Sequence, residues 1–226
     1  MIDKPNLTES EIQQNYEEFI SFVTSTFKGE RKTKLLKMYS EDELGLEVSV
    51  APAAMCEHYH LCHPGGYLQH IMNVIKMSFA SKKLFELAGA NIDFTDEQMI
   101  FAAMHHDLGK CGDPAEFGGY YVPQDQDWKY KKGEFYKMNG NLPYMEVTDR
   151  TIFLLQKYGI TYDWKEFLGF KLADGLFHEE NGKYLKQFNQ ELYLKTNLPR
   201  IIHSADYAAC RGEYDKWFFA KSEERL

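Results

Sequence analysis

The spacing of apolar residues constrains the fold of this chain more than any other feature, because it repeats every three or four positions over most of its 226 residues. Such spacing lines apolar side chains along one side of an α-helix, where they can be buried together. The stretch Thr8-Glu-Ser-Glu11 is typical of a capping box at a helix start. Apolar residues follow it at helical spacing: Ile12, Tyr16, Phe19, Ile20 and Val23. We therefore predict a helix that begins after Thr8.

The same reasoning predicts helices along the rest of the chain. Pro64-Gly65-Gly66 interrupts the chain before a long amphipathic run, and Thr95-Asp-Glu-Gln98 is a second capping signal. The apolar side of the amphipathic run carries Leu68, Ile71, Val74, Ile75 and Phe79. Pro199 suits the first turn of a last helix. The expected helices are 31–39, 67–87, the run after Thr95 that ends at Lys110, 147–158, 164–177 and 199 to the C-terminus.

Two segments lack a sustained period. Residues 41–62 indicate an irregular segment with a short strand in the sequence LEVSVA at 46–51. Residues 112–143 are rich in glycine, tyrosine and charge, and we expect a long ordered loop there, of a length that is often functional. The fold predicted from these patterns is all-α: one helical bundle domain, spanning 1–226, with a long ordered loop.

Charge excludes one class of partner. The formal net charge is −8, and the densest basic cluster is the short stretch Tyr130–Lys137. Binding along an extended nucleic acid recruits many basic residues, so we do not expect such a partner. A small local pocket for a phosphate group is compatible with this balance.

The cysteines and the apolar runs bear on location. The four cysteines, at positions 56, 62, 111 and 210, are too few for a disulfide framework in a chain of this size, and they suit reduced cytosolic thiols. We find no signal peptide, no lipidation motif and no apolar run long enough to span a bilayer. We therefore expect a cytoplasmic protein with no membrane partner.

Metal-capable side chains gather in the sequence AAMHHDLGK at 102–110. Imidazole plus carboxylate, from His106 and Asp107, suits Mn, Fe, Co, Ni, Zn or, less tightly, Mg. Adjacent helical residues point about 100° apart around the helix axis, so His106 and Asp107 can reach the same ion only if it lies between their two directions. A single His-Asp pair is a weak signal, and His105 is equally well explained as a core histidine.

Two further residues strengthen the metal hypothesis. His70 lies on the apolar side of the helix that follows the sequence HPGG, and Asp206 lies in the apolar segment IIHSADYAAC. A buried carboxylate is rare unless it is paired or ligates a metal. His203 lies three residues before Asp206, on the same helix face. We expect a metal site inside the bundle, with four ligands from three helices: His70, His106, Asp107 and Asp206.

The order of these motifs, HPGGYLQH, HHDLGK and IIHSADYA, resembles the HD-domain metal-dependent phosphohydrolases. The resemblance covers 56–212 as the HD core and leaves 1–50 as a helical extension. Similar proteins with the PGG motif include nucleases acting from the 3′ end, and other members hydrolyse nucleotides. The resemblance implies that the four ligands above hold a divalent metal ion and that the substrate is a small phosphorylated molecule, in first place a nucleotide.

The resemblance also bears on a second ion. Two-metal members carry more histidines between the His-Asp pair and the final aspartate, and here His178 is the better candidate for such a site. A histidine that often precedes an Arg-Ser pair is replaced by Met145. The resemblance therefore favours one ion, with a weak second ion held by Asp107, His178 and water as the alternative.

Other roles follow from the implied chemistry. Asp107 would bind metal and orient a water, Lys110 would contact a phosphate oxygen, and His178 would shuttle a proton if it is not a ligand. Three further residues are candidates for binding substrate: His60, Arg150 and Lys183. The alternative is a loop-capping histidine for His60 and a solvated surface charge for each of Arg150 and Lys183.

Three other hypotheses stay open. One is an HD-type di-iron oxygenase, which needs more histidines than the chain offers at the expected places. Another is a non-catalytic sensor that binds a nucleotide in the same pocket. The third is a structural zinc held within the sequence CEHYHLCH at 56–63, whose spacing does not match the usual zinc ligand pattern.

Overall fold

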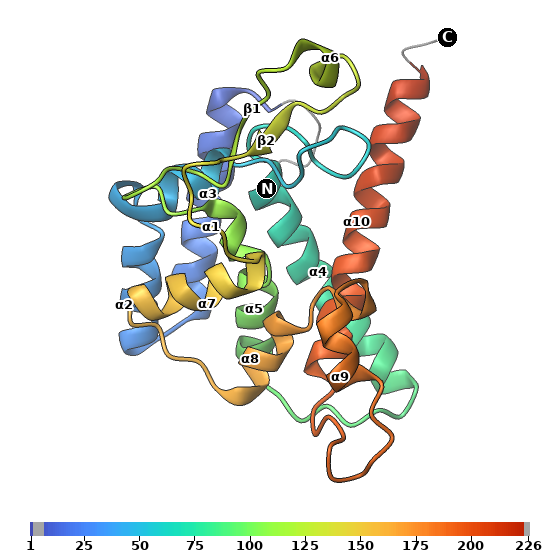
Figure 1. Cartoon of the computed structure of the whole chain (residues 1–226). Helices are drawn as coiled ribbons and strands as arrows, with labels where there is room; N and C mark the ends of the chain where they lie inside the picture. Colours follow the sequence, from blue (N-terminus) through green and yellow to red (C-terminus); the bar gives the residue numbers. More distant parts are fainter. Residues whose placement is uncertain (2–6, 224–226) are drawn as a thin grey trace. The chain divides into compact units, whose positions relative to one another are not determined.

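The computed structural model describes Met1 and residues 7–223, and it confirms the all-α expectation (Figure 1). In the described part, helices dominate, and one small antiparallel sheet is present. Two compact units divide the chain. Unit 1 contains Met1–Ile71, Leu108–Thr161 and Cys210–Leu226, and unit 2 contains Met72–Asp107 and Tyr162–Ala209. Two of the four boundaries fall inside helices, α4 (Gly66–Leu87) and α10 (Leu198–Glu223).

Unit 1 begins with the helix predicted after Thr8. The Thr8 hydroxyl accepts a hydrogen bond from the Glu11 amide, and the Glu11 carboxylate accepts one from the Thr8 amide, so the capping box is confirmed. Helix α1 buries Phe19 and Val23 and packs against α2 and α3. The remaining elements of this unit, besides the start of α4 and the end of α10, are α1 (Glu9–Thr26), α2 (Gly29–Met38), η1 (Glu41–Gly45), α3 (Leu46–Val50), η2 (Leu108–Cys111), β1 (Tyr121–Pro123), α6 (Asp127–Tyr130), β2 (Tyr136–Met138) and α7 (Val147–Lys157).

The short strand expected at 46–51 is wrong. A short helical segment, η1, which is kinked at Glu43, leads directly into α3. Buried positions in this stretch are Leu44, Gly45, Val48 and Ser49, which recur after four residues as in a helix. The alternation Leu46, Val48, Val50 suggested a strand, but Leu46 is exposed, because packing against α1 selects the helical face.

The Pro64-Gly65-Gly66 break precedes α4 as predicted. Gly65 adopts a φ of +82°, which an L side chain rarely adopts. A Cβ on Gly66 would lie 2.0 Å from the Leu61 carbonyl oxygen, so only glycine fits there. The apolar stripe of α4 is buried at Leu68, Ile71, Val74 and Ile75. Phe79, expected on the same side, is 42% exposed, so this part of the prediction is wrong.

The segment expected as one long loop, 112–143, contains regular structure instead. Strands β1 and β2 pair antiparallel, with Tyr121 opposite Met138 and Pro123 opposite Tyr136. Each strand has only three residues, which is too short for an alternating pattern to stand out in the sequence. Helix α6 lies between the two strands along the chain.

Unit 2 contains α5 (Asp96–His105), whose predicted capping box at Thr95 and Gln98 is present. The helix ends at His105, five residues before the expected end at Lys110. Gly169 of α8 approaches Ala102 so closely that an added Cβ would lie 2.7 Å from the Ala102 Cβ, which explains the tight packing of α5 on α8. The other elements of this unit, besides the end of α4, are α8 (Trp164–Lys171), η3 (Gly175–Phe177), η4 (Glu179–Asn181), α9 (Gly182–Leu185) and the start of α10.

Two helix boundaries differ from the predictions in this unit. Helix α8 ends at Lys171, and the rest of the expected helix 164–177 forms a turn and η3 around Gly175, which has a φ of +55°. Helix α10 starts at Leu198, so Pro199 occupies its first turn as predicted. The last three residues of the expected helix, 224–226, lie outside the described residues.

Candidate metal centre

Unit 2 brings together three of the four predicted ligands: His106, Asp107 and Asp206. His106 follows the last residue of α5, and its backbone is still helical. Its Nδ1 lies 2.8 Å from the Ala103 carbonyl oxygen. A carbonyl only accepts, so Nδ1 carries a proton and donates it. The lone pair of the neutral ring is therefore on Nε2.

This Nε2 faces two carboxylates. It lies 3.5 Å from Oδ2 of Asp107 and 3.7 Å from Oδ1 of Asp206. These distances exceed the usual N–H···O length of about 2.9 Å. They are close to the roughly 3.3–3.6 Å that separates two ligands of one tetrahedral cation with bonds of about 2.0–2.2 Å. Each carboxylate is therefore spaced from His106 much as a second ligand of one cation would be, while Asp107 belongs to no group of metal-capable side chains found among the described residues.

The three side chains are largely withdrawn from water. The side chains of His106, Asp107 and Asp206 are 2%, 12% and 16% exposed. Carboxylates withdrawn from water are costly unless hydrogen bonds or opposite charge compensate them. A divalent ion would neutralise both charges and accept the lone pair, and mixed imidazole and carboxylate ligands suit such ions.

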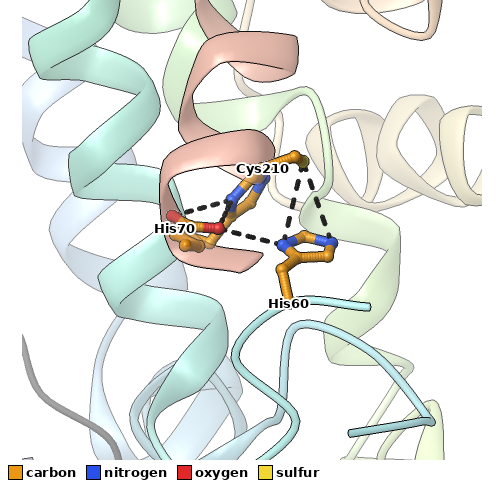
Figure 2. A group of neighbouring side chains, drawn as sticks. His60, His70 and Cys210 are labelled. Atoms are coloured by element: carbon orange, nitrogen blue, oxygen red, sulfur yellow. Dashed lines mark hydrogen bonds and ion pairs between the residues drawn. The ribbon is translucent and has the colours of Figure 1, made fainter. Parts of the chain in front are cut away.

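The fourth predicted ligand, His70, belongs to unit 1, where it lies beside His60, Cys210 and Glu213. Figure 2 shows His60 on the loop before α4, His70 on α4 and Cys210 on α10, with their rings and thiol directed toward one another. The two imidazole rings meet edge to face, with centroids 4.6 Å apart and planes at 69°. The Cys210 sulfur lies 3.8 and 3.9 Å from the two ring nitrogens of His60.

Glu213 links these two rings. Its Oε2 lies 3.0 Å from Nδ1 of His70 and 3.0 Å from Nδ1 of His60, and its Oε1 lies 3.3 Å from Nδ1 of His70. The side chains of His70 and Glu213 are 1% and 2% exposed, and that of His60 is 14% exposed. The carboxylate therefore accepts hydrogen bonds from both imidazoles inside unit 1.

Electrostatics follow from this contact. Burial is the main cause that lowers the pKa of His60, and the charges of His70 and Lys110 lower it further, against the opposing hydrogen bond to Glu213. For Glu213, burial alone would raise the pKa, but the positive charge that His70 carries when its ring is protonated and the hydrogen bonds from both rings hold it well below its usual range. The carboxyl is therefore ionised at neutral pH and serves as an acceptor only.

These four residues could also hold a metal ion, since one donor atom from each lies within 4.8 Å of the others. Glu213 and Cys210 were not among the predicted site residues. A helical signal for them exists, because Cys210 and Glu213 follow Asp206 by four and seven positions on α10. The next acidic residue, Asp215, does not fit this spacing, and its side chain is 54% exposed.

Other predicted site residues lie elsewhere in the two units. His178, between η3 and η4 of unit 2, is not part of any group of metal-capable side chains found among the described residues. Lys110 is half-buried in η2 of unit 1, near enough for its charge to act on His60. His203, whose Nδ1 donates to the Ala173 carbonyl at 2.7 Å, is held within unit 2. Lys183, 70% exposed, pairs with Glu180, as expected for a solvated surface charge.

Arg150 is buried, so its interpretation as a surface charge is wrong. Its guanidinium donates to the Pro143 carbonyl at 2.7 Å and lies over the Tyr120 ring, 5.9 Å from the centroid. Burial lowers its pKa from the usual value, with an opposing effect of Tyr120 and Asp113. These contacts give Arg150 a structural role in unit 1.

The zinc alternative at 56–63 gains no support. None of the metal-capable groups found in the described part of the chain contains Cys56 or Cys62. Burial is the first cause that raises the pKa of the Cys62 thiol to about 12, so this thiol resists the ionisation that zinc binding needs.

The chain matches no family model, no curated protein and no solved structure. Among the described helices, none combines the length and the apolar character needed to cross a bilayer.

Proposed function

We propose that this chain is a metal-dependent phosphohydrolase of the HD-domain type. One observation carries the proposal: Nε2 of a buried histidine, His106, lies 3.5 Å from a carboxylate oxygen of Asp107 and 3.7 Å from one of Asp206, close to the spacing of two ligands of one cation. The motif order HPGGYLQH, HHDLGK and IIHSADYA supports the same reaction class. The reaction is hydrolysis of a phosphate ester, with a nucleotide or a related small molecule as substrate.

The proposed cofactor is one divalent ion. His106, Asp107 and Asp206 would hold it, and His70 is the fourth ligand that the motif resemblance implies. When bound, such an ion neutralises charge on phosphoryl oxygens and makes a water molecule acidic enough to act as a nucleophile near neutral pH. Nitrogen and oxygen donors together fit Mn, Fe, Co, Ni, Zn and, less tightly, Mg.

The remaining residues have supporting roles in this proposal. Asp107 would accept a hydrogen bond from the attacking water and so orient it. Lys110 supplies positive charge to a phosphoryl oxygen as charge develops there. His178 returns a proton to the leaving oxygen, and His60 binds the substrate beside Lys110.

The substrate class follows from charge. A net charge of −8 disfavours a long polyanion, whose binding is driven by many phosphate contacts. A mononucleotide or a cyclic dinucleotide needs only a local cationic group. We place this activity in the cytoplasm, where four thiols without disulfides are stable.

The test starts with metal content. Purified protein is stripped with chelator, reloaded with Mn, Co, Ni or Mg, and assayed by elemental analysis and by phosphate release. Nucleoside mono-, di- and triphosphates and cyclic dinucleotides serve as substrates. We expect about one ion per chain and turnover with at least one of these substrates.

Matched variants decide whether the named ligands matter. Asp206→Asn should lose the ion and the activity. Asp93→Asn removes a carboxylate of the same unit that binds Lys165 and Thr196 instead, so it should keep both. Full metal loading of folded Asp206→Asn, or metal-loaded protein that releases phosphate from none of the substrates, would reject the proposal.

A further inference from the structure

Glu213 is a buried carboxylate that the chemistry above does not use. It lies on α10, and it accepts hydrogen bonds from the Nδ1 atoms of His60 and His70 at 3.0 Å each. Burying an ionised carboxylate is unfavourable unless its oxygens are satisfied by hydrogen bonds or charge. A group of this kind between two histidines therefore needs an explanation.

We propose that Glu213 is a positioning residue that fixes the tautomer and orientation of His70, so that Nε2 of His70 is presented to a metal ion. This inference rests on the proposed function, because it takes His70 to be a ligand. The same carboxylate fixes the ring of His60, the candidate for contact with substrate. Glu213 itself touches neither metal nor substrate.

The tautomer follows from donor and acceptor chemistry. A carboxylate has no proton to give, so Nδ1 of His70 must be the donor in their 3.0 Å contact. In a neutral imidazole the other nitrogen, Nε2, then holds the lone pair that a metal needs. A carboxylate behind a ligating histidine also makes that ring a stronger donor and fixes its rotation.

A histidine of unit 2 is held in the same way, through its Nδ1, but the acceptor there is a backbone carbonyl. The Ala103 carbonyl holds Nδ1–H of His106, which leaves Nε2 directed at two carboxylates. Both predicted histidine ligands are therefore held through Nδ1, one by a carbonyl and one by a carboxylate. This agreement is independent of the distances around Glu213.

A second metal ion held by His60, His70, Cys210 and Glu213 explains the geometry less well. Both Nδ1 to carboxylate distances, at 3.0 Å, are ordinary hydrogen-bond lengths and are shorter than the roughly 3.3 Å expected between nitrogen and oxygen ligands of a tetrahedral ion. The sulfur of Cys210 is almost equally far from both nitrogens of His60, at 3.8 and 3.9 Å, as in packing against a ring.

The decisive experiment measures the tautomer of His70 in metal-free protein. Nitrogen-15 NMR of the imidazole rings distinguishes a proton on Nδ1 from one on Nε2, and the His70→Gln variant identifies the signal. We expect the Nδ1–H form in the unmodified protein and a mixture dominated by the other form in Glu213→Ala. Glu213→Gln keeps the size of the side chain but removes its charge and replaces one oxygen with an NH2 group, so it should shift the tautomer less than Glu213→Ala does.

Metal affinity gives the second readout. Equilibrium dialysis with Mn or Co should show a dissociation constant about 10- to 100-fold weaker in Glu213→Ala, with a smaller loss in Glu213→Gln. The matched control is Glu57→Gln. Glu57 forms an ion pair with Lys221, which lies on α10 as Glu213 does, and this pair includes neither His60 nor His70. Circular dichroism confirms that each variant is folded, and Glu213→Gln carries the test if Glu213→Ala is not.

The outcomes separate this inference from the proposed function. An unchanged tautomer and unchanged affinity in folded Glu213 variants overturn the positioning role, even if the protein is an active phosphohydrolase. A tautomer that depends on Glu213 in a protein that hydrolyses no phosphate ester rejects only the proposed function. A cobalt spectrum with a thiolate band that disappears in Cys210→Ala would show a metal at the four-residue group and overturn the inference.

Discussion

At the scale of single residues, the groups that face a histidine ring indicate which of its two nitrogens carries a proton. His106 donates through Nδ1 to the Ala103 carbonyl, so Nε2 is the nitrogen that faces Asp107 and Asp206. A protonated ring would make the same contacts an ion-pair network that stabilises the metal-free fold. A metal centre would instead leave the metal-free protein with repelling charges, and stability measurements can separate these two cases.

We therefore predict that Asp206→Asn makes the metal-free protein more stable. Removing one of two carboxylates that crowd a lone pair relieves repulsion, and sites tuned for function often cost stability. Urea unfolding in chelator should show a free energy of unfolding raised by about 0.5–2 kcal/mol. A loss of stability of that size would indicate an ion pair at His106.

A second prediction at this scale concerns acid. Burial alone would raise the pKa of Asp93, but hydrogen bonds from Thr196 and Lys165 and the charge of Lys165 lower it overall. A carboxyl whose folded pKa is depressed adds stability above its unfolded pKa, and this contribution is lost as pH falls through the folded value. Unfolding curves measured from pH 7 down to pH 3 should therefore show a weaker acid dependence in Asp93→Asn than in the unmodified chain.

At the scale of elements, close backbone contacts decide where helices begin. The start of α4 depends on Gly66, where an added Cβ would lie 2.0 Å from a backbone oxygen of Leu61. Backbone atoms cannot move aside as a flexible side chain can. Gly212 in helix α10 has open space around it instead, with nothing within 4 Å of an added Cβ.

These two glycines give a matched pair of predictions. Gly66→Ala should lower the free energy of unfolding by about 2–4 kcal/mol through a steric clash. Gly212→Ala should raise it by about 0.5–1 kcal/mol, because alanine favours a helix interior over glycine. Chemical denaturation of the two variants checks both, and equal effects would contradict the packing described for the α4 start.

Sequence patterns were sufficient for some elements and not for others. Both capping boxes, at Thr8 and Thr95, were predicted because they depend on residues only three positions apart. Helix α3 was missed because its burial is decided by packing on α1, which no local pattern records. Glu213 was missed although it shares the helical spacing of Asp206 and Cys210, since its contact with His70 joins residues 143 positions apart.

At the scale of the whole molecule, each unit is built from separate pieces of the chain, three for unit 1 and two for unit 2. Three of the proposed metal ligands lie in unit 2, at the end of α5 and on α10. A ligand that binds only the folded state stabilises that state by mass action. Metal binding is therefore expected to appear in the unfolding of the intact chain.

We predict that metal at about 100 times its dissociation constant stabilises the chain by about 2.7 kcal/mol and that chelator reverses the effect. Thermal unfolding with and without Mn or Co measures this shift. Hydrogen exchange should slow in 96–107 and 198–209, where the proposed ligands lie. Asp206→Asn should show neither change, whereas an equal shift in that variant would place the ion elsewhere.

The late position of Glu213 in the chain has a consequence for biosynthesis. His60 and His70 are synthesised before α10, so for part of translation both imidazoles lack the carboxylate of Glu213. A nascent chain in that state can capture any cation that tolerates either ring tautomer. Discrimination among cellular metals would then begin only when synthesis has passed the last helix.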